Sequence, residues 1–223
     1  MIKVSKDRIL FNESYGEKGR SMKKGRLFVI SGPSGTGKGS ICKEIRNNTN
    51  INLSVSMTTR EPRCDEIEGE NYFFVEDKYF LEVLENEGFL EHAEVYGSLY
   101  GTPKEPVINA LDRGEDVILE IDIQGALKVK KSFPDGVFIF ILPPSLTVLK
   151  ERLHNRGTET KESIELRMNE TVEELSYIHK YDYYVVNEDL KEAAENVAAI
   201  MKSEHSRINS YTDILVKKII DND

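Results

Sequence analysis

Residues 32–40, GPSGTGKGS, combine glycines, hydroxyls and one lysine in a spacing that suits phosphate binding. Gly32, Gly35 and Gly37 let the backbone turn tightly, and consecutive amides at a helix N-terminus form a site of partial positive charge. Lys38 adds a full charge that can reach the outer phosphates of a nucleoside triphosphate. The spacing G-x-x-x-x-G-K therefore predicts a nucleotide-binding loop, with an ordinary glycine-rich turn as the alternative.

The residue after the lysine departs from the usual form of this loop, in which Ser or Thr touches magnesium. Gly39 stands at that place and Ser40 follows it. We expect Mg²⁺ to accompany the phosphates, and we leave its protein ligand open between Ser40 and Asp122, directly or through water.

A second group of polar residues lies between residues 56 and 102. Arg60 and Arg63 stand three apart beside hydroxyls in SMTTREPR, and guanidinium groups match the geometry of phosphate; a solvated loop is the alternative. Glu91 lies among apolar neighbours in FLEHAEV, where a carboxylate can accept from the N1–H and the amine of guanine, or simply face solvent. Tyr72 and Tyr100 lie in strand-like runs and are either ligand contacts or core.

Three arginines in the C-terminal half flank one polar segment, RGTETKES. Arg152, Arg156 and Arg167 are predicted to close over the triphosphate, exclude water and stabilise the charge of a moving phosphoryl group. Exposed helical arginines are the alternative.

The elements that position these residues follow from hydrophobic periodicity. Apolar runs at 27–30, 117–123, 137–142 and 183–187 predict buried strands, and helices are expected at 38–47, 125–132, 145–156 and 189–206 and around Met168. This alternation predicts an α/β fold, a parallel sheet between helices, in which ligands bind at the carboxyl ends of the strands. Glu120 and Asp122, two apart, should share a face at such an end.

Residues 51–101 differ, because short alternating runs broken by Pro and Gly predict antiparallel strands of a small inserted lobe. Asp77 is expected to cap a helix there. Thr102 and Pro103 are expected to be the cap and first residue of the next helix, which should end near Gly114.

The composition of the 223-residue chain limits its partners. With 39 Asp and Glu against 30 Lys and Arg, the chain carries a net charge of −9, so binding to nucleic acid is not expected. No apolar run is long enough to cross a membrane, and nothing marks the N-terminus for export, so we expect a cytoplasmic protein. Cys42 and Cys64 match no metal-binding spacing and are expected to be reduced thiols.

Several motifs in order resemble guanylate kinase, a family of P-loop nucleoside monophosphate kinases. They are GPSGTGKG, SVSMTTREPR, EGENYFFV, FLEHAEVYGSLYGT, LEIDIQGA and RLHNRGTETKESIELR, which lie within residues 24–207. The resemblance implies a core at 24–53 and 105–207, a GMP-binding lobe at 54–104 and a lid at about 156–168. Residues 1–23 are expected to form a flexible extension, of which the first 21, before Met22, are either an upstream extension or the result of a misplaced start codon, and residues 208–223 are expected to form a tail.

The resemblance also implies roles for individual residues. The ATP site would comprise Gly32, Pro33, Ser34, Gly35, Thr36, Gly37, Lys38, Gly39, Ser40 and, near adenine, Asn187. Guanine would contact Ser56, Glu91 and Thr102 with Asp122 close by, and the GMP phosphate would contact Arg60, Arg63, Tyr72 and Tyr100. Lys38, Arg152, Arg156 and Arg167 would be catalytic.

The implied activity is magnesium-dependent transfer of the γ-phosphoryl group of ATP to GMP or dGMP, by a monomer or homodimer. Two rival functions are a non-catalytic scaffolding module with this fold and a kinase for a phosphorylated sugar. The intact GPSGTGK argues against the first, and Ser56, Glu91 and Thr102 argue against the second.

Overall fold

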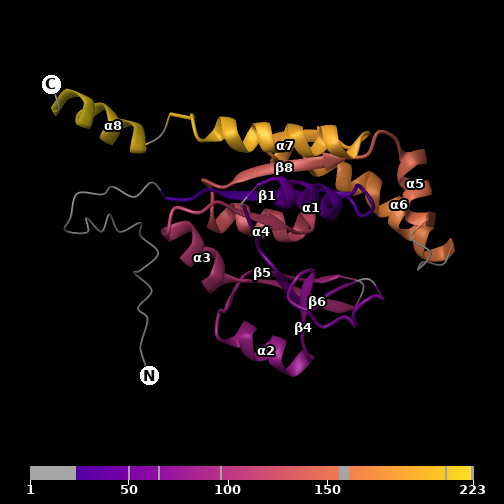
Figure 1. Ribbon diagram of the computed structural model, residues 1–223. Coiled ribbons are helices and arrows are strands. Elements are labelled where there is room, and N and C mark those ends of the chain that lie inside the picture. Colours follow the sequence, from indigo (N-terminus) through magenta and orange to yellow (C-terminus); the bar gives the residue numbers. More distant parts are fainter. Residues whose placement is uncertain are drawn as a thin grey trace.

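A computed structural model of the chain contains two sheets with helices around them (Figure 1). It describes residues 24–49, 51–64, 66–95, 97–155, 161–208 and 210–221. The elements are β1 (Leu27–Ser31), α1 (Lys38–Asn48), β2 (Asn52–Leu53), β3 (Ser56–Thr58), β4 (Tyr72–Phe74), α2 (Asp77–Glu85), β5 (Phe89–Val95), β6 (Ser98–Pro103), α3 (Lys104–Asp112), β7 (Val117–Glu120), α4 (Ile123–Ser132), β8 (Val137–Leu142), α5 (Leu146–Asn155), α6 (Lys161–Ser176), the 3₁₀ turn η2 (Tyr177–Lys180), β9 (Tyr183–Val186), α7 (Leu190–Glu204) and α8 (Ser210–Asp221). The predicted N-terminal arm, residues 1–23, and Arg156 lie outside the described residues.

The larger sheet has the order β2-β7-β1-β8-β9, and every neighbouring pair is parallel. The α/β fold with a parallel core is therefore confirmed. The short strand β2 pairs with β7 in this sheet, although the run from residue 51 was interpreted as antiparallel. Because all five strands point the same way, their carboxyl ends meet along one edge.

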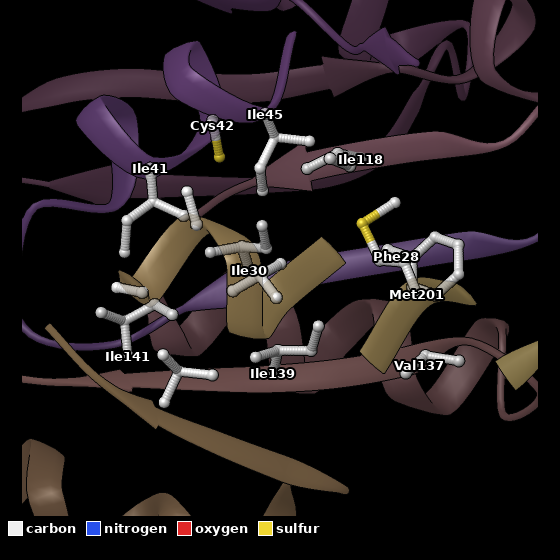
Figure 2. Packing of buried hydrophobic residues seen from close by; sticks show 14 residues of the cluster. Phe28, Ile30, Ile41, Cys42, Ile45, Ile118, Val137, Ile139, Ile141 and Met201 are labelled. Carbon is white, nitrogen blue, oxygen red and sulfur yellow. The ribbon is translucent and has the colours of Figure 1, made fainter. Parts of the chain in front are cut away.

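Alternating side chains of the parallel strands form two hydrophobic clusters, one on each face. Phe28 and Ile30 of β1 pack with α1 and α7 (Figure 2). Leu27 and Val29 pack with α3 and α4 on the opposite face. All five residues of β1 are buried, and the first four, Leu27 to Ile30, form the continuous apolar run of a strand covered on both faces.

The smaller sheet has the order β4-β3-β6-β5 and lies beside α2 (Figure 1). β6 pairs antiparallel with β3 and β5, as predicted, but β3 and β4 are parallel, which corrects the prediction of a wholly antiparallel lobe. The ten or more residues between β3 and β4 make that crossover possible. Phe80 of α2 is fully buried and stacks on Phe89 of β5 with ring centroids 4.5 Å apart.

Helices α5 and α6 lie beyond the carboxyl ends of the parallel strands (Figure 1). Leu149 and Leu153 of α5 are fully buried, and the partly buried Met168 of α6 packs against them. A Cβ atom on Gly35 would lie 2.9 Å from Leu153 and 3.0 Å from Leu149, so α5 packs directly on the glycine-rich loop. The structure thus joins the arginine-bearing helices to the predicted phosphate site.

Some predicted element boundaries were wrong. The residue before α2 is Glu76, and Asp77 is the first helical residue. Thr102 and Pro103 end β6, so α3 begins at Lys104, because pairing with β5 extends the strand through both residues. Asp122 lies after β7 rather than within it and caps α4. Among the helices of the described ranges, none has the length and hydropathy needed to span a bilayer.

Candidate active site

The glycine-rich loop connects β1 to α1 and folds around the ammonium group of Lys38. The Nζ atom donates to the carbonyl of Gly32 at 2.7 Å and to that of Pro33 at 3.0 Å, while the hydroxyl of Thr36 donates to Pro33 at 2.9 Å. Gly37 precedes α1 in the left-handed conformation, with φ 89°. The loop therefore presents a cation and a helix N-terminus at the carboxyl edge of the sheet, which is an anion-binding arrangement.

Asn187, predicted to lie near adenine, is buried directly behind this loop. Its side-chain Nδ2 donates to the carbonyl of Thr36 at 2.7 Å, and a Cβ atom on Gly37 would lie 2.3 Å from it. Its own carbonyl accepts from Nη2 of Arg152 at 2.9 Å. The end of β9, the loop and α5 are thus connected through one residue.

Two of the three predicted catalytic arginines reach the loop. Arg152 does so through Asn187, and Arg167 of α6 donates from Nη1 to the hydroxyl of Ser34 at 3.0 Å. Burial raises the pKa of Glu174, also on α6, while the positive charge of Lys38 lowers it. Helix α6 therefore presents a polar face to the loop.

The carboxyl end of β7 supplies the oxygen atoms closest to the position of the missing Ser or Thr. A Cβ atom on Gly39 would lie 3.2 Å from Oε1 and 3.3 Å from Oε2 of Glu120, so the glycine leaves room for that carboxylate. Ser40 is exposed, and Asp122 accepts from the amide of Gly125 at 2.6 Å. Within the described residues, no group of three His, Cys, Asp or Glu could hold a metal. This donor set fits Mg²⁺, which commonly binds to one or two carboxylates together with substrate phosphates and water.

The three residues predicted to contact guanine form one hydrogen-bonded row on the smaller sheet. Thr102 donates from its hydroxyl to Oε1 of Glu91 at 2.7 Å, and the hydroxyls of Thr102 and Ser56 lie 3.3 Å apart. Glu91 and Thr102 are opposite each other in the β5–β6 pair, next to a register shift between Phe89 and Glu91. Three adjacent strands, β5, β6 and β3, therefore place one carboxylate and two hydroxyls side by side.

Glu91 is a buried carboxylate, only 6% exposed, and faces the N-terminus of α4. Burial raises its pKa to about 7; the hydrogen bond from Thr102 opposes the rise, and the charge of Asp122 adds to it. A Cβ atom on Gly125 would lie 2.6 Å from Oε2 of Glu91, so only glycine permits this approach. The carboxylate therefore lies where β5 of the smaller sheet meets the first turn of α4.

A second cluster on the smaller sheet gathers Arg60, Tyr72 and Tyr100. Arg60 donates from Nε to the hydroxyl of Tyr100 at 3.1 Å, and its guanidinium carbon lies 5.6 Å from the ring centroid of Tyr72. The two tyrosine rings meet edge to face at 5.8 Å. Burial raises the pKa of Tyr72, and the negative charge of Glu120 raises it further.

Sequence reasoning missed Glu66, which connects the two arginines of this loop. Its carboxylate accepts from Nη2 of Arg60 at 2.8 and 2.9 Å and from the backbone amide of Arg63 at 2.8 Å. The guanidinium of Arg63 lies farther off, with Nη1 3.9 Å from Oε1 of Glu66. The spacing of Glu66, three residues after Arg63, was the signal that could have identified it.

Comparisons with known proteins agree on one family. The family model described as guanylate kinase matches residues 24–204. Curated guanylate kinases from Clostridium tetani and Clostridioides difficile are 52% and 49% identical to this chain over 198 residues, which is 88% of the chain and 95% and 97% of those proteins. The crystal structure of guanylate kinase from Anaplasma phagocytophilum aligns with a TM-score of 0.71 at 35% identity, covering 83% of this chain and 88% of that one.

Proposed function

The chain belongs to the guanylate kinase family, and from that premise we propose which residues bind each substrate and which stabilise the transfer. The enzyme transfers the γ-phosphoryl group of ATP to GMP with Mg²⁺, a step of purine nucleotide metabolism that yields ADP and GDP. We propose that dGMP is a second acceptor, since none of the residues assigned below requires a ribose 2′-hydroxyl.

In this proposal the glycine-rich loop binds the phosphates of ATP. When ATP binds, the ammonium group of Lys38 leaves the carbonyls of Gly32 and Pro33, which it contacts in this structure, and binds the β- and γ-phosphates. Asn187 holds the loop in place from behind through its bond to Thr36, in addition to any contact with adenine. The helix N-terminus after Gly37 contributes partial positive charge that needs no reorganisation on binding.

The row of Ser56, Thr102 and Glu91 is proposed to read guanine. An ionised Glu91 accepts from both the N1–H and the exocyclic amine, whereas adenine has no donor at N1, so AMP would leave the carboxylate buried without a partner. The two hydroxyls, which can donate or accept, fix the orientation of the ring. Asp122, which caps α4 and whose charge acts on Glu91, adds negative charge close to the base.

Arg60, Arg63 and the hydroxyls of Tyr72 and Tyr100 are proposed to bind the GMP phosphate. Arg60 is only 19% exposed and is held beside both tyrosines, so its donors are oriented before the ligand arrives. Guanidinium groups suit this task because their donors are planar and paired. A phosphate at this place would face the carboxyl ends of the core strands, where the triphosphate ends.

Transfer then depends on bringing two anions together in line. Arg152 and Arg167, which already contact the loop region, are proposed to neutralise charge on the phosphoryl group as it moves. Glu120, with Ser40 or Asp122, would hold Mg²⁺ directly or through water, and the ion would supply positive charge that offsets the charge of the phosphates. No covalent intermediate on the protein and no strong base are needed, because positioning and electrostatic stabilisation account for the rate.

We propose that residues 54–104 form a lobe that moves against the core at 24–53 and 105–207, and that the lid at about 156–168 closes over ATP. The reason is chemical: water would compete with GMP as the acceptor in an open site. A cytoplasmic location follows from the substrates, and the oligomeric state is proposed to be monomer or homodimer. Light scattering on the purified protein would decide between those two.

The observation that carries the assignment is the adjacency of the Ser56–Thr102–Glu91 row and the Arg60–Tyr100 pair on one sheet. An assay of ADP release with GMP, dGMP, AMP, UMP and ribose 5-phosphate tests it. We expect turnover with the two guanine nucleotides and at most about a hundredth of that rate with the others. Equal turnover with AMP would contradict the base-reading role.

A further inference from the structure

Glu66 binds both arginines of the proposed phosphate site at the same time. We propose that Glu66 is a positioning residue that fixes the orientation of Arg60 and Arg63 and thereby sets the affinity for the phosphate of GMP. The inference rests on the proposed function, since it assigns a role to a residue that itself touches no substrate.

The contacts of Glu66 are those of a desolvated ion pair. Its side chain is 11% exposed and that of Arg60 is 19% exposed. Both carboxylate oxygens accept from Nη2 of Arg60, at 2.8 and 2.9 Å, and Oε2 also accepts from the amide of Arg63 at 2.8 Å. One carboxylate therefore fixes a side chain and the backbone of the loop that carries both arginines.

The orientation of the Arg60 guanidinium is determined on all three nitrogens. Nε donates to Tyr100, Nη1 donates to the carbonyl of Glu61 at 2.6 Å, and Nη2 donates to Glu66. The plane also lies near the rings of Tyr72 and Phe74, at 5.6 and 5.9 Å. These bonds engage an N–H group on each of the three nitrogens, so the plane of the Arg60 guanidinium is fixed and its remaining N–H donors have set directions.

Arg63 is fixed through its backbone and not through its side chain, so its guanidinium keeps a freedom to turn that the Arg60 guanidinium does not have. Glu66 fixes its backbone amide, while its guanidinium is 41% exposed and its Nη1 is 3.9 Å from Oε1. The Arg63 side chain can therefore turn toward a phosphate without breaking its anchor. Glu66 thus keeps one arginine rigid and the base of the other arginine fixed.

Two effects of Glu66 on an anionic ligand have opposite signs. Its negative charge repels a phosphate, so neutralising it would strengthen GMP binding if charge alone mattered. Its hydrogen bonds hold the arginines in place, so neutralising it would weaken GMP binding if positioning dominates, because long side chains then lose rotamer freedom on binding. The three short bonds to a mostly buried carboxylate favour positioning.

The test is Glu66→Gln in the full chain, with Glu61→Gln as the matched control. Both changes remove one negative charge from the same loop, but Glu61 contacts Arg60 only through its backbone carbonyl and its side chain is exposed. We expect the KM for GMP to rise about tenfold in Glu66→Gln and to change less than about twofold in Glu61→Gln. The KM for ATP should stay unchanged in both variants.

Guanosine distinguishes positioning of the phosphate site from damage to the lobe. It carries the base but no phosphate, so its inhibition constant should be the same in wild type and Glu66→Gln, and Glu66→Asp should recover part of the affinity for GMP. Unchanged or tighter GMP binding in Glu66→Gln would overturn the proposal. An equal weakening of guanosine would also overturn it, because the effect would then be structural.

The Arg60→Ala variant distinguishes two possible errors, a wrong role for Glu66 and a wrong assignment of the GMP phosphate site. If Arg60→Ala loses affinity for GMP and Glu66→Gln does not, only the role of Glu66 is wrong. If Arg60→Ala binds GMP as wild type does, the phosphate site itself is wrong, and the role of Glu66 falls with it.

Discussion

The ATP loop and the proposed GMP site are built by different means. The loop is one contiguous segment, residues 32–38, between a fully buried strand and α1, and its shape is set by backbone conformation. The GMP site gathers Ser56, Glu91 and Thr102 from three strands, and it is connected by side-chain hydrogen bonds. A change in the loop should therefore alter the transfer step, and a change in the smaller sheet should alter the choice and affinity of the acceptor.

The largest expected effect is that of Lys38→Ala. Removing the charge that follows the transferring phosphoryl group should lower kcat about a thousandfold. A coupled assay of ADP release measures this. Lys43→Ala is the matched control, because Lys43 is exposed on the same helix and should retain activity within about twofold. If the Lys38→Ala variant keeps a tenth of the wild-type rate, the glycine-rich loop does not have the predicted role in the transfer step.

Glu91→Gln should change the choice of acceptor rather than the transfer step. The amide keeps only one acceptor atom and presents a donor to the guanine edge, so the ratio of kcat/KM for GMP over AMP should fall about a hundredfold. Glu94→Gln, an exposed position on the same strand, is the control. If both variants discriminate as the wild type does, Glu91 does not read the base.

The next smaller effect is the pH dependence of GMP binding, which should arise from Glu91 of the smaller sheet. Burial raises the pKa of Glu91 to about 7, so its ionised fraction, and with it the affinity for GMP, should fall about fivefold between pH 7 and pH 6. The phosphate of GMP titrates near the same pH, so the slope is compared with that of Glu91→Gln, which should be flatter. Identical slopes in the two proteins would contradict the assignment.

The same raised pKa has a consequence for stability. A carboxylate whose pKa rises from 4.5 to about 7 on folding contributes stability that is complete below pH 4.5 and is lost as the pH rises through 7. The difference corresponds to about 3 kcal/mol, so Glu91→Gln should melt at a higher temperature than the ligand-free wild type at pH 8. Thermal melts at pH 5 and pH 8 measure it, and a lower melting temperature for the variant at pH 8 would contradict the sign.

The smallest expected effect is that of Asn187→Ala, which removes the bond to Thr36. Loss of one neutral hydrogen bond, worth about 1 kcal/mol, should raise the KM for ATP about fivefold and leave the KM for GMP unchanged. Glu188→Ala, at the exposed neighbouring position, should change neither constant. A rise in the KM for GMP alone would show that Asn187 does not stabilise the conformation of the ATP-binding loop.

The parts of the fold that the sequence predicts are those with a strong local pattern. The strands β1 and β8 contain continuous apolar runs because both their faces are covered, whereas the edge strand β9 leaves Tyr184 and Val186 exposed. The loop depends on glycines at fixed spacing. Helix starts were less predictable. Thr102 has the side chain of a cap, but its pairing with Glu91 keeps it in β6, and local sequence does not contain that tertiary contact.

The polar partners within the site were the least predictable part. Ser56, Glu91 and Thr102 could be proposed as one group only through a resemblance, because 35 and 11 residues separate them along the chain. Glu66 was missed altogether, since a carboxylate in a polar loop has many possible partners until the fold brings Arg60 to it. The parallel pairing of β3 with β4 was missed for a similar reason, because neither strand alone specifies its neighbour.

Calorimetry with a crossed pair of variants tests most directly whether two separate anion sites exist. Lys38→Ala and Arg60→Ala are each titrated with GMP and with a non-hydrolysable ATP analogue. We expect Lys38→Ala to weaken binding of the analogue at least tenfold and to leave GMP within about twofold, and Arg60→Ala to show the reverse. Equal weakening of both ligands by either variant would contradict the division of the molecule into an ATP loop and a GMP site.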